Sequence, residues 1–131
     1  MFDKYKSSFI IAFDGIGLSN HNYNLNNNCL TRNRKDDLIS YYKYVLECKL
    51  IVGNIVISLD SEFIENSNMS TLKQKQDCEI NAFKRMITRI KKNYPKLKFV
   101  ILGDALYATS PVISICKKNK WDYILNLKPI D

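Results

Sequence analysis

Two aspartates stand at matching places in the sequence, each directly after a short apolar run. Asp14 follows the run at residues 7–13, and Asp104 follows the run at 98–102 and a glycine. If these runs are neighbouring parallel strands, both carboxylates leave the sheet at the edge where ligand sites of open α/β sheets collect. Two like charges held close together favour a cation between them, and oxygen ligands suit Mg²⁺ or Mn²⁺. Such ions support phosphoryl transfer. A second interpretation stays open, because Asp-Gly and Gly-Asp are also ordinary turn dipeptides.

The strands and helices that would position these aspartates follow from apolar patterning. Short apolar runs end at glycine or polar residues, which favours strands, and a longer stretch repeats its apolar residues with a helical period. The predicted strands cover residues 7–13, 39–48, 54–60, 98–102 and 123–127; the predicted helices cover about 72–93 and 110–118. An asparagine-rich stretch at 19–34 is expected to be a loop.

The order of these elements, β-β-β-α-β-α-β, predicts the fold class. Gly53 and Asn54 mark a turn between the second and third strands, so the early strands should form an antiparallel meander. The later β-α-β units require parallel strands with right-handed crossovers. We therefore expect an α/β domain with a mixed five-stranded sheet and flanking helices.

The longer predicted helix has two contrasting faces. Its apolar stripe consists of Ile80, Phe83, Ile87, Ile90 and Tyr94, and Pro95 should end the helix at or before Tyr94. The opposite face is basic and carries Lys84, Arg85, Arg89, Lys91 and Lys92. This face could contact phosphates, or it could simply be a solvated surface.

Charge and composition narrow the class of partner. The 131 residues include 20 Lys and Arg against 13 Asp and Glu, for a net charge of +7. This excess favours an anionic partner, with nucleic acid first and an anionic membrane surface second. No apolar run approaches the roughly 20 residues of a membrane-spanning helix, and the N-terminus lacks a secretory signal. Four widely spaced cysteines indicate free thiols in a reducing compartment, so the cytoplasm is expected.

Several segments, taken in order, resemble the DDE transposases of bacterial insertion sequences. They are FDGIG at 13–17, KQDCEINAFKR at 75–85, LGDALYA at 102–108 and the closing LKP at 127–129. The similarity runs roughly from Phe9 to Pro129. It implies an RNase H-like fold and divalent-metal-dependent cutting and joining of DNA at transposon ends. It also implies that Asp14 is the first catalytic acid and that Asp104, in its Asp-x-x-Tyr setting with Tyr107, is the second.

The chain departs from the family in ways that bear on activity. The family's third acid is a Glu on a helix beyond the fifth strand, and no residue up to Asp131 matches it. The usual N-terminal DNA-end-binding region is absent, and Ala105 stands where several relatives have Arg. We expect residues 1–131 to be a single partial catalytic domain, truncated and incomplete at its C-terminus.

Two glutamates could compensate for the missing acid. Glu79 lies near the start of the longer predicted helix, which resembles the placement of a metal-binding Glu in RNase H. The simpler interpretation is an acid that favours a helix N-terminus, where it interacts well with the helix dipole. Glu62 follows the third predicted strand and could contribute, or it could be a solvated loop acid.

The sequence therefore predicts a transposase fragment that uses Mg²⁺ or Mn²⁺ held by Asp14 and Asp104 to cleave and transfer DNA strands. Its implied partners are transposon ends and target DNA, with a homodimer left open and no membrane. The alternative is a catalytically inactive remnant that binds nucleic acid non-specifically.

Overall fold

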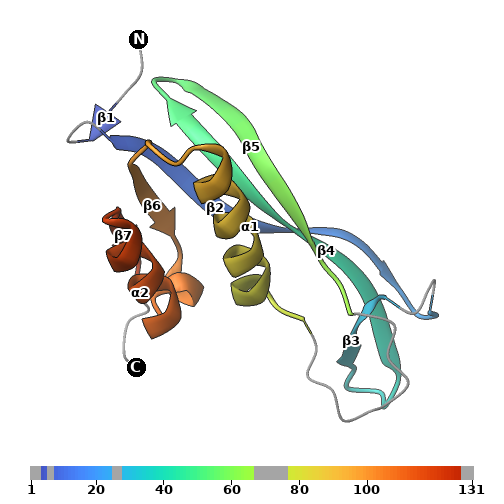
Figure 1. Cartoon of the computed structure of the whole chain (residues 1–131). Helices are drawn as coiled ribbons and strands as arrows, with labels where there is room; N and C mark the ends of the chain where they lie inside the picture. The colour runs from blue at the N-terminus through green and yellow to red at the C-terminus, as the bar shows by residue number, and fades with distance from the viewer. Residues whose placement is uncertain (1–3, 6–7, 25–27, 67–76, 128–131) are drawn as a thin grey trace.

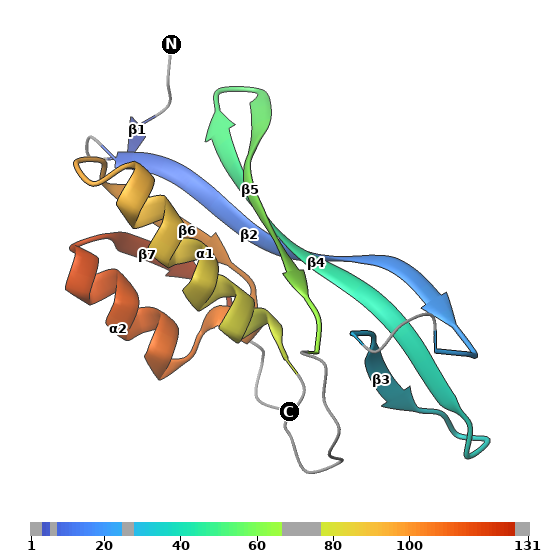
Figure 2. The same ribbon diagram turned by 45° about the vertical axis from the view of Figure 1, so that its right-hand side comes forward.

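The computed structural model describes residues 4–5, 8–24, 28–66 and 77–127, and within them the strands form one mixed sheet (Figure 1). The strands are β1 (Lys4–Tyr5), β2 (Ser8–His21), β3 (Leu30–Asn33), β4 (Ile39–Val52), β5 (Ile55–Ile64), β6 (Phe99–Gly103) and β7 (Asp122–Leu125). The helices are α1 (Glu79–Asn93) and α2 (Ser110–Asn119), with a 3₁₀ turn at Ala105–Tyr107. Both helices lie on the same face of the sheet (Figure 2).

The strand order confirms the predicted division between an antiparallel and a parallel part. The order across the sheet is β3-β4-β2-β6-β7, and β5 pairs with β4. β4 is antiparallel to β2, β3 and β5, whereas β6 runs parallel to both β2 and β7. β3 and β5 pair with successive stretches of β4 along one edge. The fold is thus the expected mixed α/β arrangement, with β1 and β3 as short additional strands.

The loop predicted for residues 19–34 is wrong at both ends. β2 does not stop at Asp14 and Gly15 but continues to His21, and β3 occupies the other end of the segment. The reason is pairing: β2 is bonded to β4 from Ile10 through His21, with one irregularity between Gly17 and Ser19. A continuous partner strand overrides the local turn preference of Asp and Gly.

Helix α1 begins later than predicted, whereas α2 begins at Ser110, within one residue of its predicted start. Residues 67–76 lie outside the described residues, and Cys78 has extended backbone, so α1 begins at Glu79 rather than near residue 72. The sequence predicts Ser110 as the N-cap of this second helix, but Ser110 is its first helical residue and Thr109 is the N-cap. Two cysteines lie within the predicted helical ranges: Cys116 is buried on α2, whereas Cys78 is exposed and precedes α1.

The turn between β4 and β5 forms as the sequence predicts. Gly53 has a φ of 58°, a left-handed conformation that glycine adopts without steric cost. Val52 pairs directly with Ile55, which leaves Gly53 and Asn54 as a two-residue connection. The hairpin fixes the register of β5 against β4.

The hydrophobic core lies between the helices and the sheet. Phe83, Ile87 and Ile90 of α1 are buried, as the apolar stripe predicted, and Met86 is buried with them. Tyr94 is different, because it caps the helix and remains 38% exposed. The ring of Phe83 packs edge-on against Phe13 of β2, with their centroids 4.8 Å apart. These contacts fix the first turns of α1 above the middle of β2.

Neither helix among the described residues has the length and apolar character needed to cross a bilayer.

Candidate acidic site

The pairing of β2 with β6 brings the two aspartates to equivalent positions of neighbouring strands. The last two residue pairs between β2 and β6 are Ile11 with Ile101 and Ala12 with Leu102. Asp14 and Asp104 each lie two residues beyond this last pair, and adjacent strands are about 4.8 Å apart. Asp14 lies within β2 rather than after it, which corrects the predicted strand end. Asp104 follows β6 as expected, and its carboxylate accepts a hydrogen bond from the backbone N–H of Leu106 at 2.8 Å.

Glu79 joins this group because α1 begins directly above β2. It is the first residue of the helix and is partly buried. A Cβ atom added to Gly15 would overlap both the Glu79 carboxylate and the ring of Tyr44. Glu79 and Tyr44 can therefore approach the strand beside Asp14 only because residue 15 has no side chain.

A buried tyrosine holds the Glu79 carboxylate. The Tyr107 hydroxyl donates a hydrogen bond to Glu79 Oε2 at 2.8 Å, and Tyr107 itself is only 1% exposed. Burial, together with this hydrogen bond and the nearby carboxylates, raises the pKa of Tyr107 well above its usual range. The hydroxyl therefore stays protonated and fixes one oxygen of Glu79 at neutral pH.

The three carboxylates repel one another. Burial raises the pKa of Glu79, the Tyr107 hydrogen bond opposes this rise, and the charges of Asp104 and Asp14 add to it. The ion pairs found among the described residues involve other acids, so none of them ties a Lys or Arg to these three carboxylates. Oxygen-only donors with excess negative charge fit the chemistry of Mg²⁺ or Mn²⁺.

Across the described part of the chain, however, no three acidic, His or Cys side chains converge closely enough to form a metal-binding group. The side chains of Asp14, Glu79 and Asp104 share one region without meeting at one point. The expected closeness of the Asp14 and Asp104 carboxylates stays a prediction.

A second group of acids lies between α1 and β5, and it includes Glu62. Arg85 binds Glu62 at 2.7 Å and Asp77 at 2.7 Å. Arg89 binds Asp60 at 3.1 Å and also pairs with Glu62. The interpretation of Glu62 as a solvated loop acid is wrong, because it lies on β5 and is held by two arginines. Its role is to tie α1 to the sheet edge.

These ion pairs divide the predicted basic face of α1. Arg85 and Arg89 already have carboxylate partners, and the Lys91 ammonium donates to the Pro95 carbonyl at 3.2 Å. Lys84 and Lys92 are exposed. The face is therefore not a uniform basic stripe, because β5 presents acids at the positions that the arginines reach. Contact of these five residues with DNA stays a prediction.

Sequence reasoning missed the parts played by Gly15, Tyr44 and Tyr107 around Glu79. A glycine directly after Asp14 within an apolar run was the available signal for a close approach. Tyr44 and Tyr107 became recognisable only when distant segments were brought together. Comparison of the chain with protein-family models, curated proteins and solved structures gave no match.

Proposed function

We propose that this chain is an RNase H-like domain of the DDE transposase type, which cleaves and transfers DNA strands by metal-dependent phosphoryl transfer. The observation that carries the proposal is the parallel pairing of β2 with β6, which brings Asp14 and Asp104 to equivalent register positions. The placement of Glu79 over Gly15 adds a third acid to the same region. The division of the sheet into an antiparallel and a parallel part is consistent with the proposed fold.

In this proposal Asp14, Asp104 and Glu79 would hold Mg²⁺ or Mn²⁺. The bound ions would activate the attacking oxygen of water or a 3′-hydroxyl and stabilise the leaving oxygen. Tyr107 is a positioning residue, because its hydroxyl fixes Glu79 Oε2. Glu79 is a better third acid than Glu62, whose two oxygens are occupied by Arg85 and Arg89.

The test is Mg²⁺-dependent nicking of a supercoiled plasmid by the chain. We expect Asp14→Asn and Asp104→Asn to lower the nicking rate about 100-fold or more, since a metal site supplies several kcal/mol of transition-state stabilisation. The matched control is Asp122→Asn, an exposed aspartate at the start of β7, which pairs with Val100 at the other end of β6. Equal nicking by all four proteins would refute the proposed site.

A second function is favoured by the absence of a converged metal-binding group among the described residues, together with the net charge of +7. We infer as the alternative a non-catalytic domain that binds nucleic acid through its charge. Its affinity would fall steeply with salt and would not respond to Mg²⁺ beyond the effect of ionic strength. Binding without any metal-dependent nicking would favour this alternative.

A further inference from the structure

One part of the sheet face that carries the helices is left uncovered by them. β4 alternates, and its residues Leu46 and Cys48 are buried beneath the helices. The next residues on that face, Tyr44 and Tyr42, pack against the edge of the core, and Tyr44 lies beside Glu79 over Gly15. Beyond the start of α1, β2, β3 and β4 extend away from both helices (Figures 1 and 2). Both tyrosines are only partly buried. The same sheet face is thus a core at one end and an aromatic surface at the other.

This surface is concave and runs to the acidic site. A pocket of about 370 Å³ is lined by Tyr42, Tyr44 and Arg32 together with Ser40 and Lys43 of β4 and residues 17–20 of β2. A neighbouring pocket of about 250 Å³ shares these three residues and adds the acids Asp77 and Glu79. We call this continuous depression the tyrosine groove, defined by Arg32, Tyr42 and Tyr44. Its inner end is the Glu79 carboxylate.

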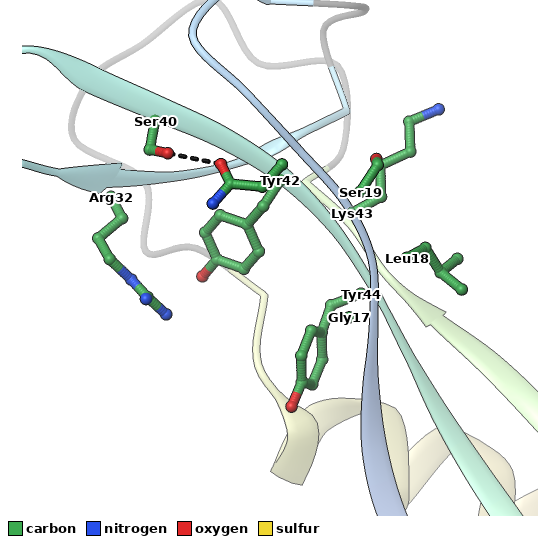
Figure 3. A pocket seen from close by; sticks show the side chains of 9 residues that line it. Gly17, Leu18, Ser19, Arg32, Ser40, Tyr42, Lys43 and Tyr44 are labelled. Carbon is green, nitrogen blue, oxygen red and sulfur yellow. Dashed lines mark hydrogen bonds between the residues drawn. The ribbon is translucent and has the colours of Figure 1, made fainter.

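The walls of the groove offer aromatic faces and positive charge. The Arg32 guanidinium lies 5.2 Å from the centre of the Tyr42 ring, and both side chains extend on one side of the β4 ribbon (Figure 3). The rings of Tyr42 and Tyr44 have centroids 6.5 Å apart and are nearly perpendicular. One flat group could therefore stack on the Tyr42 ring and a second on the Tyr44 ring, but a single flat group could not lie between the two rings.

Charge changes along the groove in a direction that suits a nucleic acid strand. The outer pocket is lined by Arg32 and Arg34; Arg34 is paired with Asp36 at 2.9 Å, so Arg32 supplies the positive charge on which the groove depends. At that end Ser40 donates a hydrogen bond to Asn20 at 2.6 Å, so neutral polar groups form the floor. Negative charge begins at Asp77 and Glu79, which line the inner pocket. Aromatic faces with basic neighbours are the features that bind single strands by base stacking and phosphate contact.

We propose that the tyrosine groove binds a single strand of nucleic acid, with bases stacked on Tyr42 and Tyr44 and a phosphate at Arg32, and leads the strand to Glu79. This inference rests on the proposed function, because it names the form of nucleic acid that enters the same site. A duplex presents its bases edge-on and stacked on one another, so it cannot use these ring faces.

The test measures binding without catalysis. The full chain, in buffer with EDTA, is titrated against a fluorescein-labelled oligothymidine of about 12 nucleotides, a length within the range of known single-strand sites. We expect Tyr42→Ile and Tyr44→Ile each to weaken binding roughly tenfold, the loss for one stacked base. Tyr42→Phe and Tyr44→Phe keep the rings and should bind as the parent does. Arg32→Gln should flatten the log-log salt dependence by about 0.7.

Two controls keep the result interpretable. Lys118→Gln removes one charge from the exposed side of α2 and should leave affinity unchanged apart from the small effect of net charge. Ultraviolet cross-linking of the parent chain to an oligonucleotide containing 5-iodouracil needs no variant, so it answers the question even if an isoleucine variant fails to fold. Cross-links should map to Tyr42 or Tyr44.

The proposed binding of a single strand would be overturned if the folded isoleucine variants kept the affinity of the parent. It would also be overturned if the cross-links mapped only to residues other than Tyr42 and Tyr44. The proposal would also be overturned if the chain bound duplex more tightly than single strand and if Lys118→Gln weakened binding as much as Arg32→Gln does. That result would point to a diffuse charge effect. Because EDTA removes metal from the assay, a failure of Mg²⁺-dependent nicking would count against the proposed function and leave this binding result standing.

Discussion

Carboxylates gather on two sides of the first turns of α1, and the two groups differ in how their charge is balanced. Between the helix and β5, Asp60 and Glu62 are held by Arg85 and Arg89. Above β2 and β6, Asp14, Glu79 and Asp104 form none of the ion pairs found among the described residues. The first group joins two elements of the fold. The second group keeps uncompensated charge close together, which destabilises a fold unless a ligand neutralises it.

The contrast separates acids that join elements of the fold from acids that have no cation paired to them. An arginine fork satisfies a carboxylate geometrically and electrostatically, so paired acids are not free to bind a cation. The pKa values follow the same division. Burial alone would raise the pKa of Asp77, but the hydrogen bonds and charge of Arg85 outweigh it and lower that pKa. The pKa of Glu79 is raised instead.

The largest expected effect comes from breaking the paired group. Replacing both arginines in one chain, Arg85→Met with Arg89→Met, leaves Glu62 and Asp77 without cations although their side chains are only 18% and 12% exposed. We expect the free energy of unfolding to fall by about 2–3 kcal/mol. Urea denaturation measures the change. The control pair Lys84→Met with Lys92→Met should stay within about 0.5 kcal/mol of the parent, and an equal loss in both pairs would contradict the assignment.

The next effect concerns ligand binding by the unpaired group. Mg²⁺ or Mn²⁺ at ten times its dissociation constant should stabilise the fold by about 1.4 kcal/mol if the ion binds only the folded chain. A thermal-unfolding series at constant ionic strength detects this gain. Asp14→Asn and Asp104→Asn should remove it, whereas Asp122→Asn should retain it. A gain that persists in both site variants would place the ion elsewhere.

A smaller effect should appear in the pH dependence of stability. Because the pKa of Glu79 is raised above its ordinary 4.5, the folded chain holds that proton more tightly than the unfolded chain. Stability therefore falls as the pH rises from 4.5 through the raised pKa. Glu79→Gln removes this fall and should stabilise the chain by about 0.5 kcal/mol at pH 7.

Asp77 supplies the opposite slope in the same experiment. Its pKa lies below the ordinary 3.8 in the folded chain, so its contribution is present above that pH and is lost as the pH falls through the lowered value. Glu79→Gln should leave unchanged the loss of stability at low pH that Asp77 causes. If the variant instead followed the parent over the whole pH range, Glu79 would not be the titrating group.

The smallest effect is expected on the helix face predicted to contact DNA. Lys84→Gln and Lys92→Gln should each lower the log-log salt slope of duplex binding by no more than about 0.9, the value for one phosphate contact. Fluorescence anisotropy over a salt series measures the slope. Lys118→Gln serves as the matched loss of charge. A decrease in slope of more than about 0.9 per lysine would show that each substitution disrupts more than one phosphate contact on this face.

The sequence alone determined the class of fold and its principal core. Apolar periodicity places Phe83, Ile87 and Ile90 in the core, and the short apolar runs become the strands of one mixed sheet. Gly53 also marked its turn correctly. These features are local, since they depend on the period of apolar residues and on backbone preferences within a few positions.

Only the tertiary structure decided how the charged residues are used. Asp14 sits next to a glycine and was expected to end a strand, yet pairing with β4 carries that strand on to His21. Arg85 and Glu62 are 23 residues apart, and nothing in the pattern near either one indicated that they bind each other. A side chain's charge is visible in the sequence, but its partner depends on strand order and register, which are set by contacts between distant segments.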